Sequence, residues 1–227
     1  MSYGVSLKVW GEYACFTRPE FKAERVSYDV ITPSAARGLL EAIYWKPAIA
    51  WVVDRIRVLN PIRFDTVRRN EVAVQGKSGH KISMGKVVNA LHGGKGAVEI
   101  FADEERQQRA TLLLRDVRYV IEAHFEPRDK DGENSAKHRD IFLRRAAKGQ
   151  CFHGPYLGCR EFPACFEPLD GAPPQPDDAL LGPRDLGWML HDLVYGQDGG
   201  REARFFRARM NDGVIEVPPL GSAEVRA

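Results

Sequence analysis

A lysine and a histidine stand side by side at the start of a segment with helical periodicity. Lys137 and His138 follow Asn134 and Ser135, either of which can cap a helix that runs to Lys148. Histidine titrates near neutral pH and can carry a proton in a reaction, and lysine supplies charge where negative charge develops. The first turn of a helix also offers N–H groups to a phosphate. This combination suits cleavage of RNA by its own 2′-hydroxyl. The alternative interpretation is a solvated lysine beside a surface or core-edge histidine.

The sequence shows no motif for a metal, a nucleotide cofactor or a nucleophilic triad. It lacks a Walker loop, a G-x-G-x-x-G fingerprint, an H-E-x-x-H pair and a G-x-S-x-G elbow. Its cysteines, Cys15, Cys151, Cys159 and Cys165, form no C-x-x-C pair and no zinc spacing with the histidines. No carboxylates have the ligand spacing of a metal-dependent DNase. We therefore expect no metal and no cofactor, and a reduced protein.

The composition is that of a globular protein. The chain has 227 residues, of which 44% are hydrophobic and 28% charged. The longest charge-free apolar run, around residues 47–53, is far shorter than the roughly 20 residues of a membrane span. Residues 1–16 alternate apolar and polar side chains, which is not the pattern of a signal peptide. We expect a cytoplasmic protein without a membrane segment.

Positive charge is concentrated in two blocks, although the net charge is only +2. Residues 63–95 hold seven basic and two acidic side chains, and residues 137–160 hold six basic and one acidic. Residues 161–227 hold six basic and twelve acidic. This asymmetry favours a localised surface for a polyanion, and solvated faces are the alternative interpretation.

Hydrophobic periodicity predicts an α+β fold. Strands are expected over 3–16, 49–59, 63–74 and 111–125, and helices from Thr32-Pro33 to residue 45 or 46 and over 135–148. With the apolar stretch 151–166 this order approximates βαββαβ, which is ferredoxin-like. A β-meander over 188–217 follows the proline-rich segment 168–183. We expect a ferredoxin-like domain over 1–167, and a proline-rich linker with a β-meander over 168–227.

Two features of this order place basic side chains for RNA. Residues 75–96 contain six glycines and four lysines, and we expect a flexible basic loop there. On a helical wheel of 135–148 an apolar arc of Ala136, Phe142, Leu143, Ala146 and Ala147 faces a basic stripe, and His138 lies at the border. The expected phosphate contacts are Lys77, Lys81, Lys86, Arg144, Arg145 and Lys148.

Several unusual strings occur together in a fixed order. They are V-W-G-E-Y-A at 9–14, P-S-A-A-R-G-L-L-E-A-I-Y-W-K-P at 33–47, R-I-R-V-L-N-P-I at 55–62, N-S-A-K-H at 134–138, R-R at 144–145 and P-Y-L-G-C-R-E-F-P at 155–163. In these strings the sequence resembles the CRISPR-associated RAMP-superfamily endoribonucleases of subtype I-C (Dvulg). The resemblance covers most of the chain and implies a ferredoxin-like domain followed by a small β-rich part.

The resemblance implies an activity, partners and catalytic residues. Members of this family cut the repeat hairpins of the CRISPR precursor transcript and remain on the 5′ handle of the mature crRNA, with the other subunits of a type I-C Cascade complex. The family's catalytic tyrosine and Lys-His pair correspond to Tyr44, Lys137 and His138. We expect metal-independent cleavage that leaves a 2′,3′-cyclic phosphate. The alternative is a non-catalytic scaffold that binds the crRNA handle.

Overall fold

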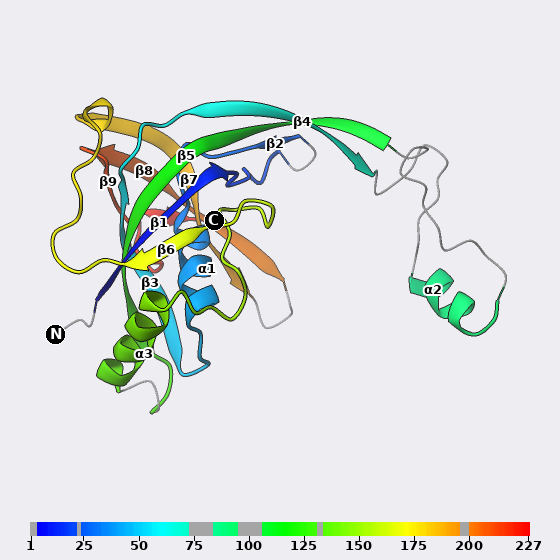
Figure 1. The fold of residues 1–227 in the computed structure, drawn as a ribbon, viewed down its shortest axis with the longest axis horizontal. Coiled ribbons are helices and arrows are strands. Elements are labelled where there is room, and N and C mark those ends of the chain that lie inside the picture. The colour runs from blue at the N-terminus through cyan, green and yellow to red at the C-terminus, as the bar shows by residue number, and fades with distance from the viewer. Residues whose placement is uncertain (1–3, 22–23, 73–83, 95–105, 131–133, 196–199) are drawn as a thin grey trace. The chain divides into compact units, whose positions relative to one another are not determined.

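The computed structural model of the chain describes residues 4–21, 24–72, 84–94, 106–130, 134–195 and 200–227. Its elements are β1 (Val5–Ala14), β2 (Arg25–Val26), α1 (Pro33–Ile43), β3 (Ile49–Val58), β4 (Phe64–Val72), α2 (Met84–Leu91), β5 (Arg106–Pro127), α3 (Ser135–Ala147), β6 (Cys165–Pro168), the 3-10 turn η1 (Asp178–Leu180), β7 (Pro183–Tyr195), β8 (Arg201–Asn211), β9 (Val214–Glu216) and β10 (Val225–Arg226). This arrangement confirms the α+β class (Figure 1). No helix among these residues is long and apolar enough to cross a membrane. All four cysteines are free thiols.

The described strands join one sheet, in which β5 is central. Along the sheet the order is β10-β8-β9-β3-β5-β1-β6, while β2 and β4 pair with β5, and β7 pairs with β8. Strand β5 is antiparallel to both β1 and β3, and β1 is antiparallel to β6. The expected meander forms β7, β8 and β9, and it extends the same sheet because β9 pairs with β3.

The chain forms two compact units, Met1–Asp65 with Leu112–Ala227, and Thr66–Thr111. The expected domain boundary after residue 167 stays a prediction. The expectation of loop throughout 75–96 is wrong for 84–91, where the second unit contains α2. Its apolar side chains recur at the helical spacing i, i+3, i+4 and i+7, a signal hidden by the neighbouring glycines: Met84, Val87, Val88 and Leu91.

Helix α1 begins where its capping residues predict. The hydroxyl of Thr32 accepts a hydrogen bond from Ala35 N over 3.2 Å, and Pro33 occupies the first turn. The helix buries its expected apolar face, which includes Ala36, Leu39, Leu40 and Ile43. It ends at Ile43, slightly earlier than expected, and Tyr44 is already extended.

Helix α3 matches its expected bounds but presents a different face to the core. The side chain of Asn134 accepts a hydrogen bond from Lys137 N, and Gly149 follows the helix with a positive φ of 63°. The buried residues are His138, Phe142 and Ala146. The expected apolar arc is therefore wrong for Ala136 and Ala147, which are exposed. These three residues are spaced at i, i+4 and i+8, so they form one row along the helix, and that row faces the core. His138 therefore lies on the buried side of α3 and not at its border.

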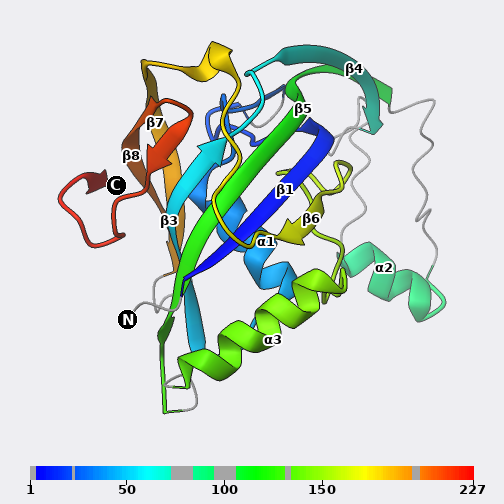
Figure 2. The same ribbon diagram turned by 60° about the vertical axis from the view of Figure 1, so that its left-hand side comes forward.

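The proline-rich segment lies on the sheet face opposite α1 (Figure 2). Leu169 N donates to Ser6 O over 2.9 Å at the start of β1, and Asp177 N donates to Leu59 O over 3.0 Å just after β3. Leu180 in η1 is fully buried in the core. The segment thus passes across β5 between β1 and β3 before it delivers the chain to β7.

Candidate active site

Two side chains that lie 94 residues apart in the sequence form a buried pair. The hydroxyl of Tyr44 and Nδ1 of His138 are 2.8 Å apart, which is a hydrogen bond. Only 6% of Tyr44 and 4% of His138 is exposed. The structure thus brings together two of the three expected catalytic residues, one just after α1 and one in the first turn of α3.

The backbone around Tyr44 is fixed on several sides. Tyr44 N donates to Leu40 O over 2.9 Å, and Tyr44 O accepts from the indole of Trp51 over 2.8 Å. The preceding carbonyl, Ile43 O, accepts from Nε of Arg145 on α3 over 2.7 Å. These contacts satisfy carbonyls that the end of α1 would otherwise leave unpaired. They also hold α3 against the end of α1, at the position from which Tyr44 reaches His138.

Aromatic rings enclose the imidazole of His138. Phe125 on β5 packs edge-on against it with ring centroids 6.0 Å apart, and the Tyr44 ring lies 5.9 Å away. Trp51 packs against both Phe125 and Phe142 behind this layer. The imidazole is therefore held in one orientation by packing and by the hydroxyl at Nδ1.

Burial sets the protonation state of Tyr44. Removal from water raises the pKa of its hydroxyl above the usual value, and the positive charge of Arg145 opposes this shift only in part. At neutral pH the side chain is therefore a neutral hydroxyl. Which of the two groups donates in the bond to Nδ1 depends on the imidazole tautomer. In either case the hydroxyl of Tyr44 holds the orientation of the ring through the bond to Nδ1.

The expected basic residues take up different positions. Lys137, Arg144 and Lys148 are exposed on one side of α3, as the helical wheel predicts. Arg145 is half-buried and donates from Nε to a backbone carbonyl, a placement that the sequence did not predict. Lys86 is exposed on α2. Lys77 and Lys81 lie outside the described residues.

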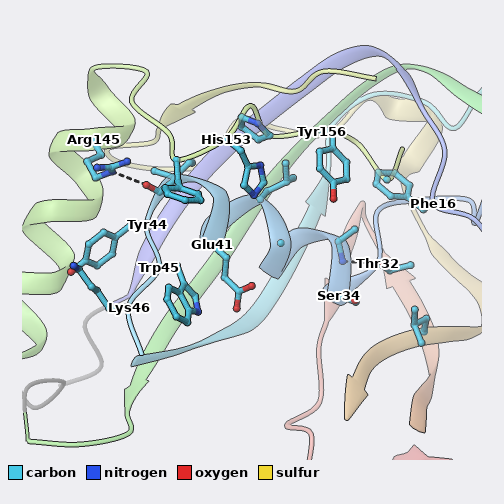
Figure 3. Close-up of a pocket in the computed structure, with 18 of the residues that line it drawn as sticks. Phe16, Thr32, Ser34, Glu41, Tyr44, Trp45, Lys46, Arg145, His153 and Tyr156 are labelled. Atoms are coloured by element: carbon cyan, nitrogen blue, oxygen red, sulfur yellow. Dashed lines mark hydrogen bonds between the residues drawn. The ribbon is translucent and has the colours of Figure 1, made fainter. Parts of the chain in front are cut away.

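A cavity of about 990 Å³ opens beside Tyr44, between α1 and the segment 152–158 (Figure 3). Arg145 and Tyr44 stand at one end of it, and Phe16 and Tyr156 at the other. The aromatic lining of the cavity was not predicted from the sequence; it includes Trp45, Phe152, His153 and Tyr156. The available signal was three aromatic rings in the short string C-F-H-G-P-Y at 151–156.

Metal-ligating side chains do not gather in the part of the chain that the structure describes: no three His, Cys, Asp or Glu residues there form a possible metal site. The groups that could perform chemistry near Tyr44 are instead the imidazole, its tyrosine partner and the neighbouring cations. An imidazole, a hydroxyl and neighbouring cations are the kinds of group that acid–base catalysis on an anionic substrate requires.

The chain matches a known protein family over almost its whole length. Residues 4–218 match the family Cas_Cas5d, described as CRISPR-associated protein (Cas_Cas5). The chain belongs to this family. Two curated relatives are named CRISPR pre-crRNA endoribonuclease Cas5d. The one from Mannheimia succiniciproducens is 52% identical over 233 residues and covers all of both chains, and the one from Thermus thermophilus is 44% identical over 231 residues, 94% of this chain and 91% of the relative.

Solved structures share the fold. A functionally uncharacterized protein from Streptococcus mutans, SMU1763c, is 22% identical with a TM-score of 0.66, covering 99% of this chain and 97% of that chain. A CRISPR-associated protein is 23% identical with a TM-score of 0.66, covering 99% and 96%. A chain of a CRISPR RNA-guided surveillance complex is 13% identical with a TM-score of 0.51, covering 95% and 91%.

Proposed function

We propose that this protein is a CRISPR pre-crRNA endoribonuclease that cuts the repeat hairpins of the precursor and then stays on the crRNA 5′ handle within a Cascade-type complex. Relatives up to 52% identical over the full length carry the name of this activity. The observation that carries the proposal is the 2.8 Å hydrogen bond between Tyr44 and His138, because it joins the two expected catalytic side chains in a fixed geometry. The partners that this function implies are the repeat RNA, the mature crRNA and the other type I-C subunits.

The reaction moves a proton at two oxygens and needs positive charge at the phosphate. The 2′-oxygen attacks the phosphorus and loses its proton, the bond from phosphorus to the 5′-oxygen breaks, and that oxygen gains a proton. The products are a 2′,3′-cyclic phosphate and a 5′-hydroxyl. His138 carries the proton at one of these two steps, and Tyr44 fixes the ring through Nδ1, so that transfer falls to Nε2. Lys137, the residue before His138 in the same turn of α3, supplies positive charge to the phosphorane.

We further propose that the core is ferredoxin-like. The elements β1, α1, β3, β5, α3 and β6 follow one another as βαββαβ, interrupted only by β2, β4 and α2. In the sheet the four strands stand in the order β3-β5-β1-β6 with every neighbouring pair antiparallel. The order of the four strands in the sheet, second-third-first-fourth, supports this assignment.

The two faces of the sheet favour the helix side for RNA. On the opposite face the segment 169–177 crosses the strands, and Glu122 is occupied by ion pairs with Arg55 and Arg57. The helix side carries the Tyr44–His138 pair and the exposed basic side chains of α3. We infer that the repeat RNA approaches along α3 and the end of α1.

Cleavage of a modified repeat RNA tests the activity and its mechanism. Purified protein incubated with repeat RNA in EDTA should cut it and leave a cyclic phosphate. A substrate with a single 2′-deoxy substitution at the cut should remain intact, and His138→Ala should not cut either substrate. Undiminished cleavage of the deoxy substrate would contradict attack by the 2′-hydroxyl.

The burial of His138 favours a second candidate function, a non-catalytic scaffold for the crRNA handle. Such a scaffold needs the basic face of α3 but no reactive imidazole. The same assay separates the two functions, because a scaffold would bind repeat RNA with high affinity and leave it uncut with and without divalent cations.

A further inference from the structure

We propose that the cavity between α1 and the segment 152–158 is a stacking site for an unpaired nucleotide of the RNA, beside the scissile phosphate. The inference rests on the proposed function, since it deepens the same site. Tyr44 lines the cavity and also contacts His138, so a nucleotide held there would lie next to the proton carrier. The cavity volume of about 990 Å³ is at the upper end of the range of ligand pockets.

Large aromatic side chains are left in solvent at this cavity. Trp45 is 54% exposed and Phe152 is 87% exposed, and both line the cavity together with His153 and Tyr156. Folding gains nothing from apolar surface that stays in water, so clustered exposed rings mark a surface that acquires a partner. The rings of His153 and Tyr156 are nearly parallel, with an interplanar angle of 30° and centroids 6.2 Å apart (Figure 3).

The charges around the rings select the class of partner. Lys46 and Arg145 line the cavity. Glu41, the one acidic residue among its described lining residues, is paired over 2.6 Å with Arg37, which also binds Asp192. The lining therefore combines aromatic faces with an excess of positive charge, which matches a ligand with a flat base and a phosphate. The base must be unpaired, because a base inside a duplex has both faces covered by its neighbours.

The wall of the cavity is held rigidly before any ligand binds. Phe152 N donates to Ala42 O at the end of α1 over 2.7 Å, and Cys15 N donates to Leu157 O over 3.0 Å. Leu157 is fully buried, and Tyr156 forms an isolated β-bridge with Pro163. The backbone that carries these rings is thus fixed at both ends of the segment, which lowers the entropy lost when a base stacks on them.

Binding of repeat RNA with matched tryptophan variants tests the proposal. Trp45→Ala removes a ring from the cavity, and Trp188→Ala removes a ring of similar exposure, 46%, from β7. We expect Trp45→Ala and Phe152→Ala each to raise the Kd of uncut repeat RNA by about 5- to 150-fold, the range for loss of one stacked base. Trp188→Ala should change Kd less than twofold, and Phe152→Tyr should restore most of the affinity.

The salt dependence of binding separates stacking from charge. Stacking releases no counterions, so the slope of log Kd against log salt should be the same for Phe152→Ala and the wild type. As a second measurement, 2-aminopurine is placed at each unpaired position next to the repeat stem. Its fluorescence should be quenched at one position by the wild type and recover in Phe152→Ala.

The possible outcomes distinguish a failure of the stacking site from a failure of the proposed nuclease function. If the wild type cuts repeat RNA but both cavity variants bind it with unchanged Kd and no position is quenched, the stacking site is wrong and the nuclease stands. If those variants bind RNA normally but fail to assemble with other complex subunits, the face belongs to a protein partner, which also overturns the proposal. If the wild type does not cut but shows the quenching, the nuclease proposal fails and the stacking site stands.

Discussion

Arg145 and Ile43 join the two helices of the candidate active site: Nε of Arg145 on α3 donates to the carbonyl oxygen of Ile43, the last residue of α1, over 2.7 Å. The residue after Ile43 is Tyr44, whose hydroxyl bonds to His138 in the first turn of α3. The two helices are therefore linked twice, once through a backbone carbonyl and once through the hydrogen bond between Tyr44 and His138. We expect Arg145 to act as a positioning residue, because its contact holds α3 against the residue before Tyr44.

Removal of Arg145 should impair stability and rate together. Arg145→Ala leaves the Ile43 carbonyl without its charged donor, which costs about 1–3 kcal/mol of unfolding free energy. It also loosens α3 against α1, so the plateau of single-turnover cleavage should fall. Arg145→Lys should recover only part of both losses, because lysine lacks the rigid guanidinium fork. If Arg145→Ala changed only Kd and the salt slope, a phosphate contact would explain this residue better.

The Tyr44–His138 pair should contribute to the rate and not to RNA affinity. His138→Ala removes the proton carrier, and loss of such a group costs about 10²- to 10⁴-fold in rate. Tyr44→Phe keeps the ring but removes the hydroxyl at Nδ1, so a smaller loss of rate is expected. Both variants should bind uncut repeat RNA with the wild-type Kd. The control is His124→Ala, which removes a half-exposed histidine that is bonded to Asp54 on β3.

The pH dependence distinguishes an orienting tyrosine from an ionising one. Burial raises the pKa of Tyr44, so the hydroxyl keeps its proton up to and beyond its usual pKa of about 10. The rate–pH profiles of the wild type and Tyr44→Phe should therefore have the same shape below pH 10 and differ only in height. An alkaline limb near neutral pH that Tyr44→Phe abolishes would contradict this role.

On the exposed face of α3, we expect Lys137 to contribute to the cleavage rate, and Arg144 and Lys148 to contribute to the affinity for RNA. Lys137→Ala is expected to lower the single-turnover plateau at saturating protein, since Lys137 adjoins the proton carrier. Arg144→Ala and Lys148→Ala should raise Kd, leave the plateau nearly intact, and each lower the salt slope by about 0.7–0.9. The division fails if Lys137→Ala and Arg144→Ala lower the plateau equally.

Local signals predicted most of the fold. The cap at Thr32, the cap of α3 at Asn134 or Ser135 with Gly149 after it, and the strand over 111–125 each depend on neighbouring residues. The structure confirms all three, with Asn134 as the cap and with β5 longer than expected. Helix α2 was missed because flanking glycines outweighed a short apolar repeat. The buried face of α3 was predicted wrongly at Ala136 and Ala147. The alanine side chain is so small that its exposure to solvent costs little free energy, and the sequence does not show whether a given alanine is buried or exposed.

The sequence itself singled out Lys137 and His138 at the start of a helix, whereas Tyr44 was a candidate only through the family resemblance. No pattern in the sequence links Tyr44 to His138, because the contact arises from the packing of α1 against α3. From the sequence, the positive charge of Arg145 indicated phosphate binding. Only the fold shows that its Nε donates a hydrogen bond to the carbonyl of Ile43. The cavity aromatics were overlooked because their value depends on exposure, which a sequence does not display.

Three glycines between α3 and β6, one of which lines the cavity, form a matched series. Gly158 has a positive φ of 84°, and a Cβ atom there would lie 2.0 Å from the carbonyl oxygen of Cys15. Gly149 has a positive φ of 63° but open space around it, and Gly154 has neither constraint. The series therefore separates a collision with backbone from conformational strain alone.

Gly158→Ala should be the most damaging of the three, because the added methyl must push the wall away from Cys15, whose N–H bonds to Leu157 O. Gly149→Ala carries only left-handed strain, about 1–2 kcal/mol, which corresponds to a fall in Tm of about 2–8 °C for a chain of this size. Gly154→Ala should leave Tm unchanged within about 1 °C.

Gly158→Ala should lower Tm by more than Gly149→Ala does. It should also weaken repeat RNA binding, since the rings of 152–156 shift with the wall. Thermal denaturation and RNA titration of the three variants check the order. Equal Tm values for Gly158→Ala and Gly154→Ala would show that the wall does not pack against Cys15 as described.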